Sequence, residues 1–534
     1  MGYNFAGGGD DSDQVFLLPP DPREWLPGRH LAWAMRAAAQ ELDMAPFVAW
    51  YRADGQGHRA FHPRLMVALV MYCYCKGIRS SRAIEMATYD DVGARVICGN
   101  RNPDHSTIHR FTSRHEQAVK GLLVASLVAC AKQGLVSVDV VAGDGTKLKA
   151  NASMAANATA EQLEIEIAGL EALIAAEVET WVAQARAADA AEDALFGDGD
   201  DGGDAGVRAG GPGTLARVTG KVVRRQKAKA RLDGEAAARR AQATADREEK
   251  ITKARERVAA ARRRAAQQEA AADARVAGYQ ARASGKAAAG SRKRPDGRAP
   301  AAAADHCHVR RARQAAERAE QALAKAAAAP VPDGQDPAAK ANTTDPSSRV
   351  MPAKGGGFGQ LHNVQILAGK HQIIVGIGTH DNPTDTAALH PLLDKARANL
   401  DAAGIGDRIA AALFDAGYAS NTNFTTPCEA ELYVALTKEA RQTGRLRGGK
   451  KPETMKPSWQ QMATRLDTPE GKALYRRRSA MIEPVFAQLV ARLGRHLNYR
   501  DTKTDLELHL WAASHNFLKS IRVPRRTTAP VPAT

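Results

Sequence analysis

The stretch GLVSVDVVAGDGTKLKA at residues 134–150 indicates a buried strand that ends in an acid. Its valines alternate along the run, which is the pattern that β-branched residues show in a buried strand. The Asp-Gly pair at Asp144 predicts a turn that closes the strand. A second strand-like run ends in the same way, at Asp415 in FDAGYAS (414–420). The two runs therefore predict two strands with an acid at the end of each.

These two strand-end carboxylates predict a site for divalent ions. Burying a carboxylate is unfavourable unless it is paired or binds a metal, and hard ions such as Mg²⁺ prefer oxygen ligands. A third acid is Glu483 in YRRRSAMIEPVFAQL (475–489), where apolar neighbours indicate an amphipathic helix. Glu470 and Glu507 are the alternatives for this third position. Either Asp motif alone would be interpreted as an ordinary turn former, so the prediction rests on the three acids together.

The residues after 340 alternate between strand-like and helical patterns, which predicts a mixed α/β domain. GQLHNVQILAGK (359–370) and HQIIVGIGTHD (371–381) predict a hairpin. TDTAALHPLLDKARANLDAAG (384–404) predicts an amphipathic helix capped by Thr384. One more strand and two helices are expected in ELYVAL (431–436), 471–495 and 504–521.

Residues 26–130 predict an all-α N-terminal domain. PRLMVALVMYCYCKG (63–77) has the apolar content of a buried helix, with a glycine at its C-terminal end. Two further helices are expected, one capped by Ser81 and the next capped by Asp104 or Ser106. Basic side chains on the last helix suit either a helix-turn-helix DNA reader or an ordinary bundle with a solvated face: His105, His109, Arg110, Arg114 and His115.

Residues 156–340 differ in composition and predict a long helical insertion. Apolar residues at steps of three or four begin it, as in a coiled coil: Leu163, Ile167, Leu170, Ile174, Val178 and Trp181. GDGDDGGDAG (197–206) predicts a loop, and the Ala- and Arg-rich stretches after it predict loosely packed helices, partly disordered around 283–300. The His-Cys-His run at 306–308 lacks partner ligands at a metal-binding spacing. Flexible tails are expected at 1–25 and 522–534.

The composition is compatible with a nucleic-acid partner. The 75 Lys and Arg residues exceed the 59 Asp and Glu residues, which gives a net charge of +16 and a pI near 9.6. A basic surface attracts phosphates, although an arginine-rich proteome would give the same surplus. The six cysteines form no CxxC pair, and the chain has neither a signal-peptide pattern nor an apolar run of membrane-spanning length. We therefore expect a reduced, cytoplasmic protein of several domains.

The ordered set of motifs resembles the DDE transposases of bacterial insertion sequences. In chain order the set comprises GDGTKLKANAS (143–153), TDPSSRVM (344–351), KGGGFGQLHNVQ (354–365), FDAGYAS (414–420) and YRRRSAMIEPVFAQL (475–489). FHPRLMVALVMYCYCKGIRSSRAIE (61–85) is similar to the helical N-terminal domain of that family. The resemblance covers most of residues 55–155 and 340–520, and it extends to the insertion only in that the insertion is helical.

This resemblance implies an RNase-H-like catalytic core in residues 131–155 and 341–521, interrupted by the helical, coiled-coil-like insertion. It implies the first Asp on the first strand, the second on the fourth and the Glu on a following helix. Asp144, Asp415 and Glu483 would then be the catalytic residues and the ligands of two Mg²⁺ or Mn²⁺ ions. Double-stranded DNA, as terminal inverted repeats and as target, would be the partner. The enzyme would act on DNA as a homodimer, in the nucleoid and not at a membrane.

The Tyr-Arg-Glu signature of the family has a different spacing in this chain. Many relatives place three residues between Arg and Glu, whereas four residues separate Arg478 from Glu483, and Val490 takes the place of a Lys. Tyr475 and Arg478 are still predicted DNA contacts, as is Arg476, which shares a helical face with Glu483. Other cations, which could equally be ordinary surface residues, complete the predicted phosphate contacts: Lys147, Lys149, Lys354, Arg110 and Arg114, with Arg492 or Arg495 in place of the missing Lys.

Three other functions stay open from the sequence. A structure-specific nuclease or Holliday-junction resolvase would use the same core and ions but would not join DNA. A non-catalytic DNA-binding factor descended from a transposase would not need all three acids. A coiled-coil structural protein would leave residues 134–155 and 410–490 unexplained. A transposase accounts for all of these features.

Overall fold

The structure, a computed structural model, describes residues 22–51, 60–196, 213–288, 299–353, 356–436 and 456–522. The chain divides into two compact units. The first is built from the chain on both sides of the insertion, Met1–Asn157 and Asn342–Thr534, and the second is Ala158–Ala341. Within the first unit the two ends of the interruption lie side by side, because the backbone N–H of Thr343 donates to the carbonyl of Ala156 (2.8 Å).

The first unit is organised around a six-stranded mixed sheet. Its strands are β1 (Val140–Lys149), β4 (Arg349–Pro352), β5 (Phe358–Ala368), β6 (Ile374–His380), β7 (Ala411–Phe414) and β8 (Glu431–Val434). The order is β4-β5-β1-β7-β8, and β6 also pairs with β5. β5 is antiparallel to β1, β4 and β6, whereas β1, β7 and β8 are parallel neighbours. β1 and β5, which lie on opposite sides of the insertion in the sequence, are therefore paired neighbours in the sheet.

The predicted turn at Asp144 is wrong, because β1 continues through this residue without a break. β5 provides the reason, since its backbone pairs with β1 along this whole stretch and places Ile366 opposite Asp144. On its other edge β1 pairs with β7 only from Val140 to Ala142. Asp144 therefore lies in mid-strand, just beyond the point where β1 loses its β7 neighbour.

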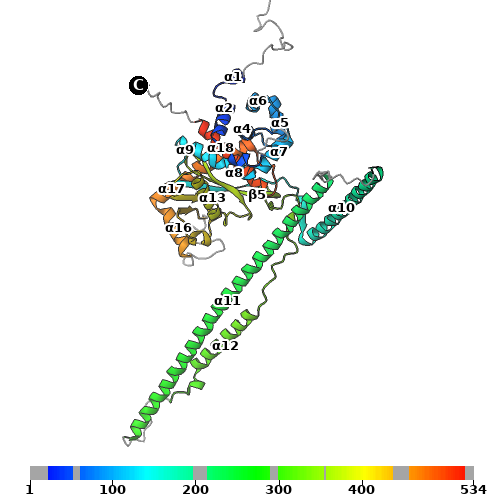
Figure 1. The fold of residues 1–534 in the computed structure, drawn as a ribbon. Coiled ribbons are helices and arrows are strands. Elements are labelled where there is room, and N and C mark those ends of the chain that lie inside the picture. The colour runs from blue at the N-terminus through cyan, green and yellow to red at the C-terminus, as the bar shows by residue number, and fades with distance from the viewer. Residues whose placement is uncertain are drawn as a thin grey trace, which may run out of the picture. The chain divides into compact units, whose positions relative to one another are not determined.

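Several helices pack on this sheet (Figure 1). α13 (Leu389–Ala402) contacts β5 and β6, α17 (Pro469–Leu493) runs along β1, β5 and β7, and α18 (Lys503–Arg522) contacts β6. α14 (Asn421–Thr425) and α16 (Pro457–Asp467) pack together next to β8. The approach of α13 is close, because a Cβ on Gly376 of β6 would lie 3.2 Å from the Cβ of Ala396. Short 3-10 turns η3 (Lys370–Gln372) and η4 (Ala416–Tyr418) follow β5 and β7.

The N-terminal part of the first unit is entirely helical over the residues described. Its helices are α1 (Pro22–Trp25), α2 (Leu31–Glu41), α3 (Ala45–Val48), α4 (Pro63–Cys75), α5 (Ser81–Asp90), α6 (Val92–Cys98), α7 (His105–Arg114), α8 (Glu116–Lys120) and α9 (Leu122–Lys132). α4 is buried as expected, and Gly77 beyond its end has φ +83°, in the left-handed region. The cap of α5 is Ser80 rather than Ser81, and that of α7 is Asp104.

A buried ion pair joins this helical part to the chain that follows the sheet. Arg79 Nη1 donates to Glu507 Oε1 of α18 and to the carbonyl of His496, both at 2.8 Å. Glu507 Oε2 accepts the backbone N–H groups of Asn498 (2.8 Å) and Tyr499 (2.9 Å). The helices and the sheet share one continuous hydrophobic core. The N-terminal helices and the sheet are therefore one packed body.

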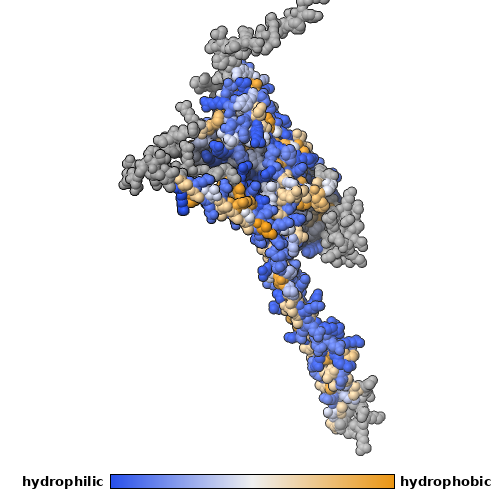
Figure 2. Space-filling view, turned by 90° about the vertical axis from the view of Figure 1, so that its right-hand side faces the viewer, coloured by the Kyte–Doolittle hydropathy of each residue, from blue (hydrophilic) through white to orange (hydrophobic). Residues whose placement is uncertain are grey.

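The second unit consists of long helices. They are α10 (Ala160–Phe196), α11 (Gly213–Ala288) and α12 (Cys307–Ala328), and the 3-10 turn η2 (Ala303–Asp305) precedes α12. Where the insertion starts and ends, β2 (Asn157–Thr159) pairs with β3 (Lys340–Asn342). The 3-10 turn η1 (Met154–Ala156) immediately precedes β2. α11 packs against α10 and α12, and the surface of α11 and α12 is largely hydrophilic (Figure 2). Ion pairs Lys229–Glu164 (3.1 Å) and Arg313–Glu269 (2.6 Å) link the helices.

The expected apolar stripe of α10 is buried only at its start. Leu163 is fully buried, whereas Val178 is 40% and Trp181 50% exposed. The small core of this unit is otherwise made mainly of alanines, so few large side chains hold α10 along its length. The predicted loop at 197–206 and the centre of the 283–300 segment lie outside the described residues. None of the described helices is both long and apolar enough to cross a membrane.

Candidate catalytic site

Two of the three predicted acids meet at one arginine. Arg478 of α17 brings Nη2 to 2.9 Å from Asp144 Oδ2 and to 3.9 Å from Asp415 Oδ2. The Asp144 and Asp415 side chains are 23% and 41% exposed, and that of Arg478 is 11% exposed. The two carboxylates therefore point to a common, partly open position, where a positive charge balances them.

Backbone groups hold both carboxylates in place. Asp144 Oδ1 accepts the N–H of Gly145 (2.8 Å), and Asp415 Oδ1 accepts the N–H of Gly417 in η4 (2.9 Å). The Oδ2 atoms of Asp144 and Asp415 therefore face Arg478. Burial raises the pKa of Asp144, and the nearby Asp415 raises it further, against the lowering effect of Arg478. The position favours an additional cation, because two acids share one arginine.

A fourth acid, which the sequence did not indicate, lies at the same place. The helix expected to begin at Thr384 begins only at Leu389, and the preceding turn directs Asp385 towards β1 and η4. A Cβ on Gly145 would lie 2.8 Å from Asp385 Oδ1. A Cβ on Gly417 would lie 3.3 Å from Asp385 Oδ2 and 3.0 Å from Asp415 Oδ1. A side chain at Gly145 would collide with Gln365 Nε2 (2.6 Å) and Asp385, whereas a side chain at Gly417 would lie tightly against Asp385 and Asp415.

Two buried amides hold Asp385. Its Oδ1 accepts Asn363 Nδ2 (2.8 Å) and Gln365 Nε2 (2.7 Å), both from β5. Tyr418, which is fully buried, donates its hydroxyl to Gln365 Oε1. These neutral amide donors fix the orientation of the Asp385 carboxylate without bringing a counter-charge to it. The sequence did contain a signal: Asn363 and Gln365 lie on the same face of β5 as Leu361 and Leu367, and buried amides require partners.

α17 contributes an arginine, rather than its glutamate, to this position. Tyr475 donates its hydroxyl to the carbonyl of Phe414 (3.2 Å), which fixes α17 at the end of β7. Glu483 lies five positions beyond Arg478, which is about 140° around a helix. Glu483 is accordingly exposed, as is Arg476. The structure therefore places Arg478 next to the two aspartates, and Tyr475 against the carbonyl of the residue before Asp415.

The residues present suit a hard divalent cation, although the predicted triad is not assembled. Carboxylate oxygens are the ligands that Mg²⁺ and Mn²⁺ prefer, and two of them converge here. Among the described residues, however, no three His, Cys, Asp or Glu side chains lie close enough together to hold a metal ion. Of the two alternatives to Glu483, Glu507 is buried against Arg79, and Glu470 lies in the first turn of α17.

The remaining predicted contacts are spread over the first unit. Lys149 is exposed and Lys147 partly buried at the end of β1, where the backbone of Lys149 pairs with Arg495 and Leu497. Arg110 and Arg114 are exposed on α7, whereas His115 is buried among aromatic rings and is unavailable to a ligand. The backbone of Arg492 lies against Gly77. Lys354 lies outside the described residues.

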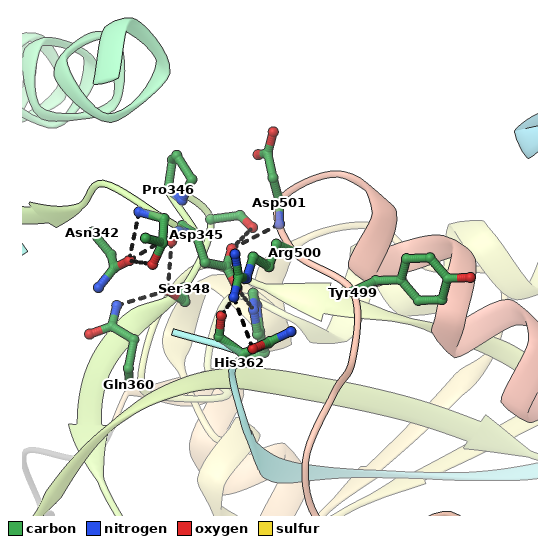
Figure 3. Close-up of polar contacts among 12 residues, drawn as sticks. Asn342, Asp345, Pro346, Ser348, Gln360, His362, Tyr499, Arg500 and Asp501 are labelled. Atoms are coloured by element: carbon green, nitrogen blue, oxygen red, sulfur yellow. Dashed lines mark hydrogen bonds and ion pairs between the residues drawn. The ribbon is translucent and has the colours of Figure 1, made fainter. Parts of the chain in front are cut away.

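The TDPSSR segment forms a buried polar cluster beside β5 (Figure 3). Asp345 Oδ2 lies 2.8 Å from His362 Nε2, and its Oδ1 accepts the N–H of Asp501 (2.9 Å) and the hydroxyl of Ser347 (3.0 Å). Burial tends to raise the pKa of Asp345, but these hydrogen bonds outweigh it and the pKa is lowered. The cluster fixes the chain that returns from the insertion to β5 and to the segment before α18.

Comparisons with known proteins agree with the motifs. A family model described as a transposase domain (DUF772) matches residues 21–114, and one described as a transposase DDE domain matches residues 338–517. No curated protein and no solved structure matches the chain significantly. The first match covers the N-terminal helices, and the second covers β5 to β8, α17 and most of α18. With these two domains in this order, the chain belongs to the DDE transposases of insertion sequences.

Proposed function

We propose that this transposase cleaves DNA and transfers strands at the ends of an insertion sequence in a metal-dependent reaction. The observation that carries the proposal is the convergence of Asp144 and Asp415 on Arg478. The strand order supports an RNase-H-like core. Without the short β4, the order across the sheet is β6-β5-β1-β7-β8, and only β5 is antiparallel to its neighbours. By their order in the chain, these strands are the third, second, first, fourth and fifth of the sheet. Asp144 is on the first strand and Asp415 follows the fourth.

Asp144 and Asp415 are the proposed ligands of two Mg²⁺ or Mn²⁺ ions. The third carboxylate has two candidates. The family resemblance supplies Glu483, which is exposed on α17. The structure supplies Asp385, whose Oδ2 approaches the same small space above Gly417 as Asp415 Oδ1. Asp385 is the better placed of the two, and the isosteric variants described below decide between them.

The chain's own residues provide position and charge for phosphodiester chemistry. Bound divalent ions supply an activated nucleophile and stabilise the leaving oxygen. Gly145 and Gly417 orient the two aspartates through their N–H groups. Tyr475 holds α17 against β7, which keeps Arg478 at the carboxylates and near a phosphate brought to them. Lys147 and Lys149, farther along β1, are proposed to contact the DNA backbone on either side.

Double-stranded DNA is the proposed partner, as the terminal inverted repeats and the target. The net charge of +16 supports a polyanionic ligand. Arg110, Arg114 and Arg476 are exposed cations on α7 and α17 that would add phosphate contacts, with Lys354 as a further candidate. A homodimer on DNA is proposed, because two ends have to be joined to one target.

The test is a strand-transfer assay with purified protein, DNA carrying the inverted repeats that flank its gene, a target plasmid and Mg²⁺. A transposase cleaves the ends and joins them to the plasmid. A nuclease or resolvase cuts without joining, a DNA-binding factor only shifts the DNA in a gel, and a structural protein does neither. Cleavage that persists in EDTA would contradict the proposed metal dependence.

A further inference from the structure

Away from the carboxylates, the first unit has an open pocket of about 620 Å³. Three segments that are distant in sequence line it: the residues after α3, helix α7 and the first residue of α18. The side chains used below are Trp50, His109, Arg110, Ser113, Arg114 and Lys503. Lys503 Nζ donates to Ser113 Oγ (2.9 Å), which connects α18 to α7 across 390 residues of sequence. The pocket is therefore a feature of the folded unit and not of one helix.

The pocket is cationic. Arg110, Arg114 and Lys503 carry permanent charges, and none of its lining residues is an acid. Within the described part of the chain neither arginine has a carboxylate partner in an ion pair. Asp104, the N-cap of α7, is not among the lining residues, and its oxygens accept hydrogen bonds from Ser106 and Thr107. Three uncompensated cations around one concave surface suit an anionic ligand with more than one phosphate.

The pocket also presents an indole ring to solvent. Trp50 is 63% exposed, the most exposed tryptophan among the described residues. The backbone around Trp50 is nevertheless held in position, because Phe47 stacks on Phe111 (5.8 Å between ring centroids) and Tyr51 stacks on His115 (5.8 Å). The chain on both sides of Trp50 is thus anchored to α7 and its C-cap by aromatic rings. A large aromatic face that is held outward beside cations is suited to stacking with a ligand.

We propose that this pocket binds an unpaired nucleotide at the end of the DNA substrate, with the base stacked on Trp50 and the flanking phosphates on Arg110, Arg114 and Lys503. The inference rests on the proposed function, since it assumes a DNA substrate. An indole beside cations matches a nucleotide, which combines a flat π surface with a phosphate. Inside a duplex both faces of each base are covered by its neighbours, whereas an unpaired base at the end is free to stack on Trp50.

The position of the pocket relates it to the catalytic residues. α18, which provides Lys503, packs on β6 and on α4, and Arg79 of the N-terminal part is paired with Glu507 of the same helix. A nucleotide held in the pocket is therefore fixed relative to the sheet that bears Asp144 and Asp415. Binding an unpaired base in the pocket would fix the position of the DNA end relative to the carboxylates without recognition of a duplex sequence.

The test measures binding of the full chain to three fluorescent DNAs in EDTA: a blunt duplex, the same duplex with two unpaired nucleotides at one end, and a short single strand. Trp50→Ala is expected to weaken binding of the unpaired end by about 5- to 100-fold and of the blunt duplex by less than about 3-fold. Trp50→Phe should restore most of the loss, because phenylalanine keeps a stacking face. Trp181→Ala, which removes another half-exposed indole in the second unit, is the matched control and should change neither.

Arg114→Ala distinguishes the contribution of charge from that of stacking, because it should weaken the binding of all three DNAs by a similar factor and lower the salt dependence of binding. Equal binding of blunt and unpaired ends by the wild type, or equal losses on both with Trp50→Ala, would overturn the inference and leave the proposed function intact. A wild-type chain that binds none of the three DNAs would instead remove the proposed function. Circular dichroism of each variant excludes loss of fold as the cause.

Discussion

Asp385→Asn is the most informative substitution at the carboxylates. The amide has the same shape, so its Oδ1 can still accept Asn363 Nδ2 and Gln365 Nε2, now at 2.8 and 2.7 Å. Hydrogen bonds to a charged acceptor contribute about 1.5–3 kcal/mol and neutral ones about 0.5–1.5 kcal/mol. Two such bonds would each weaken by about 1 kcal/mol. The loss of unfolding free energy is therefore at most about 2 kcal/mol, and relief of repulsion with Asp144 and Asp415 offsets part of it.

The effect on catalysis is expected to be much larger. Substitution of groups that only support a metal ligand lowers affinity or activity about 10- to 100-fold, so replacing a ligand should lower cleavage at least about 100-fold. Cleavage of end-containing DNA in Mg²⁺ is measured together with Mn²⁺ binding, followed by the paramagnetic resonance signal of the free ion. Asp394→Asn, an exposed aspartate on α13, is the control and should behave as the wild type.

Glu483→Gln is measured in parallel, because it distinguishes the two candidates for the third carboxylate. If Asp385 is a ligand, its variant loses both cleavage and Mn²⁺ binding while melting close to the wild type. If Asp385→Asn keeps cleavage within about threefold and Glu483→Gln abolishes it, the reasoning from the amide pair is refuted and the family position is correct.

Three further outcomes are expected. Arg79→Ala leaves Glu507 buried without its partner, so chemical denaturation should show a loss of about 3–5 kcal/mol, against a change within about 0.5 kcal/mol for the exposed Arg82→Ala. Asp345→Asn should remove a pH-dependent part of the stability. Because its pKa is lowered in the fold, the Asp345 carboxylate stabilises the protein at pH values above the ordinary Asp pKa, and this contribution is lost as the pH falls through the lowered pKa. The melting temperatures of the variant and the wild type should therefore converge in acid. Tyr418→Phe leaves Gln365 Oε1 without its donor, so a loss of about 1–3 kcal/mol in unfolding free energy is expected; a variant as stable as the wild type would contradict the role given to this hydroxyl.

Local patterns predicted the elements of this fold well where one physical cause dominated. The apolar run of α4, the strand-like runs of β5 and β6, and the strand that ends before Asp415 all have the expected structure, because burial largely determines them. Asp144 was misjudged because an Asp-Gly pair favours a turn only when no neighbouring strand pairs with it. β5 returns from beyond the insertion and supplies that pairing.

The candidate site was predictable only in part, because it depends on contacts between distant segments. Asp385 resembles a helix cap in sequence, and its role becomes visible only when Asn363 and Gln365 are seen to hold it. Glu483 was chosen for the apolar residues around it, yet those same residues form the buried face of α17 and leave the acid about 130° from the centre of that face. The apolar stripe of α10 was likewise only partly predictable, because periodicity predicts an apolar face but not which element covers it, and the end of this stripe is exposed.

The central claim is that Asp144 and Asp415 are needed for metal-dependent cleavage and not for DNA binding. The most direct measurement compares Asp144→Asn with the wild type on DNA carrying the element's ends, by gel shift and by cleavage in Mg²⁺. We expect unchanged or slightly tighter binding, because the variant removes one negative charge from a basic protein, and no detectable cleavage. Near-normal cleavage by this variant would contradict the account.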